Sequence, residues 1–386
     1  MDEGLAATYV TTMAVDSSAE PLALYAGTDG GRVFIWNGAH WQDITGNLAT
    51  LAVYALELGS GTSPGKLYAG TWSGVWQWDG AVWTSISSGL PDLGVSALAS
   101  DGQATPALLF AGTGTGVYQW DGSSWTSVTG GAGVQNVHAL ELDPRTNPQT
   151  LYAGSSTERG HAYEGDIYRW NGTAWTHLPS QKLKAPLTTL SLNLQGGSTE
   201  IYVATWGAGI FRWDGRHWSK LESGACAAFQ ALALDTSRVP PVPYAGGCGV
   251  FQWNGGAWSG VGSGLPFDYS QALAFDFKTV PPTLYAASSN CGVYAAQIPV
   301  PPPTISRAAA GGQTFQLVLR GANFHPSAQI QIDGAPAPQT VYKSGSKLMA
   351  KGGAELKAML PKGVAVQITV KNEDDGGGSV PFSFKR

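Results

Sequence analysis

Short segments in which apolar and polar residues alternate run along most of this chain, and such alternation predicts β-strands with one buried face. Residues 137–143, Val-His-Ala-Leu-Glu-Leu-Asp, are a clear example. A second short apolar segment follows each of these after a connection rich in Pro, Gly or Thr. This second segment occurs seven times, around Tyr25, Tyr68, Phe110, Tyr152, Tyr202, Tyr244 and Tyr285. The chain is therefore expected to be all-β.

A third element repeats six times with the pattern aromatic-x-Trp-[Asn/Asp]-Gly-x-x-Trp, in which x is any residue. The copies span residues 34–41, 76–83, 118–125, 168–175, 211–218 and 251–258. Their closing tryptophans are 42, 42, 50, 43 and 40 residues apart, which is the length of one four-stranded propeller blade. Residues 1–298 therefore predict a seven-bladed β-propeller whose last blade lacks its outer strand. At that open edge we expect residues 2–6 to pair with residues 292–296, or the chain to self-associate.

Each Asn-Gly or Asp-Gly pair predicts a tight hairpin, because a two-residue type I′ turn needs positive φ at both central residues. In the first copy the turn is Asn37-Gly38, which places Phe34 opposite Trp41 and puts Phe34, Trp36 and Trp41 on one face. Thirteen of the fifteen tryptophans lie in these hairpins. Their periodicity favours packing between blades, and the alternative is a ring of sugar-stacking sites.

The last part of the chain has a different composition. Four prolines within residues 299–303 predict a stiff, extended linker. Residues 304–386 contain no tryptophan and alternate in short segments at 315–319, 329–332 and 365–370. Short strands separated by turn residues predict a small immunoglobulin-like β-sandwich over residues 304–386.

Two families share these features. The repeat, best seen in Leu-Glu-Leu-Asp-Pro at 140–144, resembles the BNR/sortilin-like extracellular propellers, although it departs from that family's Ser-x-Asp-x-Gly-x-x-Trp box. The C-terminal part resembles an IPT/TIG domain in Arg-Gly-Ala-Asn-Phe at 320–324 and Ile-Asp-Gly-Ala-Pro at 332–336. These resemblances imply an extracellular propeller beside a spacer or adhesion domain. Xyloglucanase-type glycosidases belong to the first family, so the resemblance also allows an enzyme.

Charge and cysteine content narrow the possible partners and the cellular location of the protein. Residues 1–303 carry 12 basic and 22 acidic side chains, and this acidity argues against nucleic acid as a partner. No apolar run reaches membrane-spanning length. A charged fraction of only 13% in a Gly-rich β composition favours a secreted or cell-surface protein over a cytoplasmic one. Cys226 and Cys248 are expected on the same rim as disulfide partners, with Cys291 as a competitor.

Two tryptophans stand outside the hairpins. Trp72 and Trp206 fall in the predicted loops between the second and third strands of blades two and five. Other repeats have small or polar residues there, Asp29 among them, so packing between blades does not require Trp. Large apolar residues on a loop rim mark recognition surfaces. We therefore predict that Trp72, Trp206 and Asp29 bind a ligand; the alternative is that the indoles fold over the central channel.

Blade four is longer than the others on that same rim. Its extra residues form a predicted loop with a dense polar cluster, which includes Glu158, Arg159, His161 and Tyr163. Insertions on one rim are where propellers usually bind partners, so these four residues join the predicted ligand site. The alternative is a tolerated surface insertion.

Signals for catalysis are weak. No Ser-His-Asp order, phosphate-binding loop or metal-ligand spacing occurs, so no catalytic residue, metal or cofactor is predicted. The leading hypothesis is a non-catalytic extracellular or cell-surface binding and scaffold module that recognises a protein or polysaccharide through one propeller rim. The alternative is a carbohydrate-active enzyme or lectin, for which Glu158 and Glu164 are the residues to test.

Overall fold

The computed structural model of the chain describes residues 5, 9–48, 52–59, 66–131, 133–159, 162–179, 183–221, 226–238, 240–261, 269–279, 281–289, 292–299, 301–312, 314–325, 327–372 and 377–386, with residues 158, 159, 162 and 163 described by backbone alone. It divides into two compact units. The first holds residues 1–234, 243–276 and 284–296, and the second holds residues 235–242, 277–283 and 297–386. No helix in the described residues is long and apolar enough to cross a membrane.

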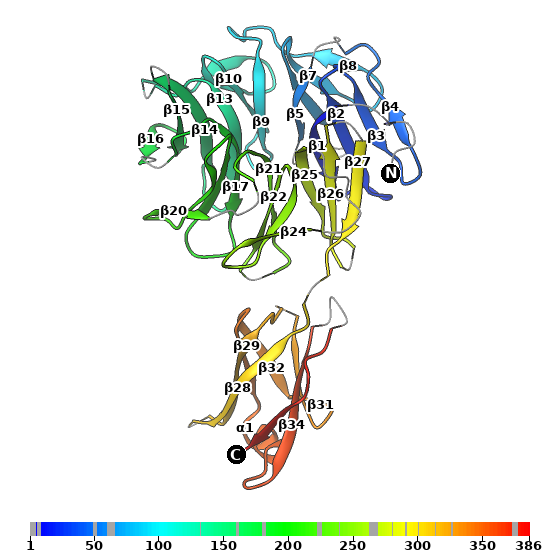
Figure 1. Ribbon diagram of the computed structural model, residues 1–386, viewed down its shortest axis with the longest axis vertical. Coiled ribbons are helices and arrows are strands. Elements are labelled where there is room, and N and C mark those ends of the chain that lie inside the picture. Colours follow the sequence, from blue (N-terminus) through cyan, green and yellow to red (C-terminus); the bar gives the residue numbers. More distant parts are fainter. Residues whose placement is uncertain are drawn as a thin grey trace. The chain divides into compact units, whose positions relative to one another are not determined.

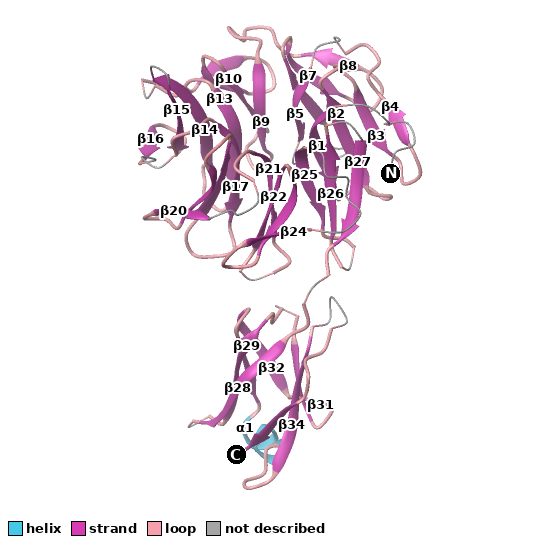
Figure 2. Ribbon diagram, viewed as in Figure 1, coloured by secondary structure: helices cyan, strands magenta, loops and turns pink. Residues whose placement is uncertain are grey.

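The fold is all-β apart from one short helix (Figures 1 and 2). Up to residue 297, the described residues form seven antiparallel sheets whose strands lie in sequence order. The first two sheets are β1 (Val10–Asp16), β2 (Ala23–Thr28), β3 (Val33–Trp36), β4 (Trp41–Asp43), and β5 (Val53–Leu58), β6 (Leu67–Thr71), β7 (Gly74–Trp78), β8 (Trp83–Ser85). The next two are β9 (Val95–Asp101), β10 (Leu108–Thr113), β11 (Gly116–Trp120), β12 (Trp125–Ser127), and β13 (Val137–Asp143), β14 (Thr150–Arg159), β15 (Ala162–Trp170), β16 (Trp175–Leu178).

The remaining three sheets continue the same order. They are β17 (Leu187–Asn193), β18 (Glu200–Thr205), β19 (Gly209–Trp213), β20 (Trp218–Leu221); β21 (Phe229–Asp235), β22 (Val242–Gly247), β23 (Gly249–Trp253), β24 (Trp258–Gly260); and β25 (Ser270–Asp276), β26 (Thr283–Ser288), β27 (Gly292–Gln297). The seventh sheet has three strands among the described residues. The predicted pairing of residues 2–6 falls almost wholly outside those residues.

Most neighbouring sheets contact one another through their first strands. These contacts join β1 to β5, β5 to β9, β9 to β13 and β13 to β17, and they also join β25 back to β1. Thr188 of β17 donates a hydrogen bond to the Phe229 carbonyl of β21 (2.8 Å), and the rings of Tyr244 and Phe275 connect the sixth sheet to the seventh. Figure 1 shows β1, β5 and β9 toward the middle of the unit, with β4, β8 and β16 at its margin.

The hairpin tryptophans hold neighbouring sheets together. The closing Trp83 is fully buried, and its indole N–H donates to the Ile44 carbonyl of the preceding sheet (2.8 Å). Trp125 and Trp175 make the same bond to the carbonyls of Ile86 and Val128. Because these indoles are used in the packing of one sheet on the next, the structure agrees with the packing role that periodicity favoured.

The register of the hairpins differs from the prediction. Trp36 lies opposite Trp41, and Phe34 lies opposite Asp43, so the loop has four residues instead of two. The Asn37 carboxamide oxygen accepts the amides of the two residues that follow Gly38, and positive φ occurs at Gly38 but not at Asn37. A type I′ turn needs both. The three aromatic side chains still share a face, because Trp36 and Trp41 are direct cross-strand partners with ring centroids 5.7 Å apart.

The second unit is built on two four-stranded sheets around a common apolar core. One sheet contains β28 (Thr304–Gly311), β29 (Gln316–Ala322), β33 (Lys347–Lys351) and β32 (Gln339–Ser344); the other contains β31 (Ala335–Pro336), β30 (Gln329–Ile332), β34 (Ala365–Lys371) and β35 (Phe382–Lys385). Helix α1 (Gly353–Met359), which was not predicted, contributes Leu356 to the core. Phe324, from the Gly-Ala-Asn-Phe motif, is buried there as well.

Candidate functional site

Exposed apolar residues gather at one end of the sheets in the first unit. In the second sheet Val53, where β5 begins, lies opposite Thr71, where β6 ends, so the β6–β7 loop and the start of β5 share one end. The same holds in the other sheets because their topology is the same. Six of the large apolar residues that are exposed occupy this end. We call these six residues the aromatic rim: Tyr9, Tyr54, Trp72, Leu93, Trp206 and Tyr269.

Trp72 is held in place although 60% of it is exposed. Its indole N–H donates to the Tyr54 hydroxyl, and the two rings meet edge to face with centroids 5.7 Å apart. The indole also lies over the backbone of Gly94, where an added Cβ would come within 3.0 Å of the ring. These contacts hold the side chain in one position, and preorganisation of this kind lowers the entropy cost of binding in general.

Trp206 is 48% exposed, and its backbone is fixed by a neighbouring loop. Its amide donates to the Pro186 carbonyl (2.8 Å), and the residue forms an isolated bridge with Ala228. Gly207 donates to Ala227 at 3.1 Å. Both tryptophans are thus largely open to solvent, and neither is buried as a plug of the channel would be.

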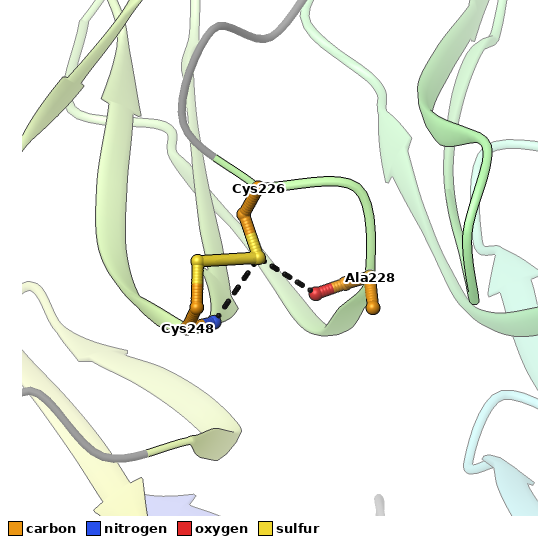
Figure 3. Close-up of a disulfide and its surroundings, with 3 residues drawn as sticks. All are labelled: Cys226, Ala228 and Cys248. Atoms are coloured by element: carbon orange, nitrogen blue, oxygen red, sulfur yellow. Dashed lines mark hydrogen bonds between the residues drawn. A yellow bond between two sulfur atoms is a disulfide. The ribbon is translucent and has the colours of Figure 1, made fainter.

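The loop that supports Trp206 carries a disulfide (Figure 3). Cys226 and Cys248 are bonded, with Cα atoms 6.2 Å apart. The Cys248 amide donates to the Cys226 sulfur at 3.3 Å, and that sulfur lies 3.2 Å from the Ala228 carbonyl oxygen. This pairing fixes the backbone on which Trp206 rests. The predicted competitor, Cys291, lies outside the described residues.

The insertion in the fourth sheet is a strand extension and not the predicted loop. β14 and β15 continue pairing from Ser155 opposite Asp166 as far as Arg159 opposite Ala162. Extra residues can lengthen a hairpin without leaving backbone groups unpaired, and this accounts for the difference. Glu158, Arg159 and Tyr163 are therefore strand residues, and their side chains, like the whole of His161, lie outside the described atoms.

Two carboxylates on the predicted rim are described in detail. Asp166 accepts from His177 Nε2 at 2.8 Å and from the Thr157 hydroxyl at 3.2 Å, so it ties the base of the long hairpin together. Asp29 is exposed, and its amide donates to the Tyr9 carbonyl (3.0 Å). Asp29 therefore lies beside a member of the aromatic rim.

A cavity of about 630 Å³ lies between the first strands of five sheets. Its walls come from β1, β5, β9, β13 and β17, and from the connections after β9 and β13. Those connections leave the ends of the first strands, so the cavity reaches toward the end opposite the aromatic rim. Sequence reasoning did not find it.

Two carboxyl groups border this cavity, those of Glu57 and Glu141. Burial raises the pKa of Glu57 to about 7, against the opposing effect of hydrogen bonds from Ser100, whose amide lies 2.9 Å away. Burial raises the pKa of Glu141 to about 8, and the charge of Glu57 adds to the shift. Both side chains keep some accessible surface because they border the cavity, while the surrounding strands keep them poorly solvated.

A signal for these two residues was present in the sequence. Each occupies the fifth position of its first strand, where the other five sheets have Ala14, Ala99, Ser191, Ala233 and Ala274. Alignment of the seven strands with one another isolates the two glutamates as exceptions. The sequence pattern alone does not show that Glu57 and Glu141 line the same cavity, which the structure does show.

No protein-family model matches this chain, and no curated protein matches it in sequence. In fold it is similar to bacterial extracellular domains. The extracellular domain of the one-component system BT4673 from B. thetaiotaomicron aligns with a TM-score of 0.59 and 14% identity, over 82% of this chain and 44% of that one. The extracellular domain of the hybrid two-component system BT4673 from B. thetaiotaomicron aligns with a TM-score of 0.58 and 15% identity, over 81% of this chain and 44% of that one. BBS1N in complex with ARL6DN gives 0.56 and 13%, over 77% of this chain and 94% of that one.

These likenesses are likenesses of fold alone, because the identities are low. The chain spans less than half the length of the BT4673 structures that it matches.

Proposed function

We propose that this chain is a non-catalytic extracellular binding module, in which a seven-bladed β-propeller recognises a polysaccharide or protein through the aromatic rim. The cyclic contacts from β1 through β17 and from β25 back to β1 support the propeller. The two sheets that share one core support an immunoglobulin-like sandwich of the IPT/TIG kind over residues 304–386, with residues 299–303 as linker. The extracellular domains of similar fold support the location.

The observation that carries the proposal is the placement of exposed aromatic rings at one end of one unit. Tyr9, Tyr54, Trp72, Trp206 and Tyr269 are all substantially exposed there. Rigid aromatic side chains provide large contact areas at a small cost in side-chain entropy, and for this reason they dominate recognition surfaces. Acidic residues are in excess in this part of the chain, and nucleic acid is therefore not among the proposed partners.

The test is affinity electrophoresis of the whole chain through gels that contain plant, fungal or bacterial polysaccharides, with a pull-down from surface extracts as the protein arm. The double variant Trp72→Ala with Trp206→Ala should lose more than tenfold in affinity for whichever partner the wild type retains. Phe277→Ala is the matched control, since Phe277 is 43% exposed and follows the far end of β25. Wild-type affinity in the double variant would contradict the rim assignment.

The same polysaccharides test the non-catalytic part of the proposal. Incubation with the wild-type protein should release no reducing sugar. Sugar release that disappears in Glu158→Gln or Glu164→Gln would instead assign the chain to the carbohydrate-active enzymes.

A further inference from the structure

The two cavity glutamates are placed alike by the repeat. In β5 Glu57 lies opposite Tyr68, and in β13 Glu141 lies opposite Tyr152, which is the same register. The strand between them, β9, has Ala99 at the matching position, and Ala99 also lines the cavity. Because alanine is short, it leaves open the space between two glutamates that lie two sheets apart.

The rest of the cavity wall carries no compensating charge. Among the described residues that line it, none is Lys, Arg or His. The polar groups supplied by the other elements are neutral: the hydroxyls of Thr12, Ser100 and Thr189 and the carboxamides of Gln103 and Gln149. The neighbouring Asp101 carboxylate is engaged by Gln149 Nε2 at 2.6 Å. Any charge on Glu57 or Glu141 therefore finds no basic partner among the described residues that line the cavity.

The hydrogen bonding of the pair is incomplete as well. Glu57 accepts the Ser100 amide, whereas no hydrogen bond to the Glu141 carboxyl is found among the described residues. An ionised carboxylate held away from water without a partner is costly, and a bound cation removes that cost. Both groups border the same space, so one ligand can reach both.

The size and lining of the cavity indicate which cation fits. Its volume of about 630 Å³ lies in the range of small-molecule sites, roughly 300–1,000 Å³. Two carboxylates supply few of the six to eight oxygen ligands that Ca²⁺ takes. Leu56, Leu98 and Leu140 add aliphatic wall beside the carboxyl groups, which suits methylene groups. We propose that this cavity binds a small aliphatic amine whose ammonium groups pair with Glu57 and Glu141.

This site is separate from the aromatic rim and does not depend on the proposed function. The test is isothermal titration calorimetry of the whole chain with putrescine, with 1,4-butanediol as its neutral counterpart and with Ca²⁺ as the metal probe. At pH 8.5 we expect putrescine to bind and butanediol not to bind. At pH 6 the carboxyl groups are largely protonated, and we expect putrescine to bind at least tenfold more weakly, although its amines keep their charge.

Substitutions assign the site. Glu57→Gln and Glu141→Gln should each weaken putrescine binding at least tenfold, whereas Glu355→Gln, which makes the same change in net charge in helix α1, should leave it unchanged. Thermal melts verify folding of each variant, and the pH comparison requires no substitution. Equal binding of butanediol, retention of putrescine by both glutamine variants, or binding of Ca²⁺ in place of the amine would each overturn the proposal. Polysaccharide hydrolysis that is lost in Glu141→Gln would overturn it in favour of a catalytic pair.

Discussion

Substitution of Trp83 gives the sharpest test of how neighbouring sheets are held together. Trp83 is 1% exposed, packs against Trp78 with ring centroids 5.3 Å apart, and donates its indole N–H to the Ile44 carbonyl at 2.8 Å. Truncation of a buried Trp to Ala typically costs about 3–5 kcal/mol of unfolding free energy. We expect Trp83→Ala to lie at the upper end of that range, because it leaves a cavity and an unpaired carbonyl together.

Trp83→Phe separates the hydrogen bond from the packing. Phenylalanine fills most of the site but leaves the Ile44 carbonyl without its donor, a loss of about 1–2 kcal/mol. Trp72→Ala is the control, because Trp72 is 60% exposed and a surface substitution usually changes stability by roughly 0.5 kcal/mol or less. Urea denaturation followed by circular dichroism gives the three free energies.

The expected order of stability is Trp72→Ala near wild type, then Trp83→Phe, then Trp83→Ala. If Trp83→Ala unfolds within about 1 kcal/mol of wild type, the hairpin tryptophans do not hold the sheets together and the packing argument fails. If Trp83→Phe equals wild type, the indole bond contributes nothing and shape alone is sufficient.

Three further changes should have measurable effects. Because burial raises the pKa of Glu141 from 4.5 to about 8, the unfolding free energy of the wild type should fall between those pH values as this carboxyl ionises. Glu141→Gln should therefore melt near wild type at pH 5 and above it at pH 9, and equal melting temperatures at pH 9 would contradict the burial argument. Asn47→Ala removes bonds to both the amide and the carbonyl of Trp83 and should cost about 1–3 kcal/mol in urea denaturation, whereas a neutral result would show that water replaces both. Gly321→Ala should lower the melting temperature by several degrees, since its Cβ would stand 1.8 Å from the Thr304 carbonyl oxygen; unchanged melting would mean that β28 moves aside at no cost.

The repeated part of the fold could be predicted because each hairpin is specified locally. The Trp-Asn-Gly and Trp-Asp-Gly patterns located six hairpins, and all six occur. The predicted strand register was wrong by two residues, because Trp36 lies opposite Trp41 and not opposite Ala39. The carboxamide of Asn37 organises a four-residue loop, whereas the prediction took Asn-Gly as a two-residue turn. Side-chain capping competes with the turn types that dipeptides favour, so a dipeptide predicts a reversal more reliably than a register.

The strand extension at the fourth sheet was missed for a related reason. Its polar composition suggested a loop, yet Thr157 opposite Glu164 and Glu158 opposite Tyr163 continue the ladder. The residues of the extension are mostly small or polar, so they do not show the alternation by which the other strands were recognised. Helix α1 was missed because it is short and begins at two glycines.

The candidate sites differ in how far sequence could reveal them. Trp72 and Trp206 were found because they break the repeat with large side chains, whereas Tyr9 and Tyr269 were missed because the residue before a first strand follows no repeated rule. Glu57 and Glu141 break the repeat as well, at a position otherwise occupied by Ala or Ser. In a chain of similar sheets, packing selects similar residues at equivalent positions, so an exception at such a position calls for a reason other than packing. The aromatic exceptions lie at the end of the sheets where the first strands begin, and the acidic exceptions lie nearer the opposite end. Exposed aromatic rings and a pair of buried carboxyl groups favour different ligand chemistry, and for this reason the rim and the cavity need separate experiments.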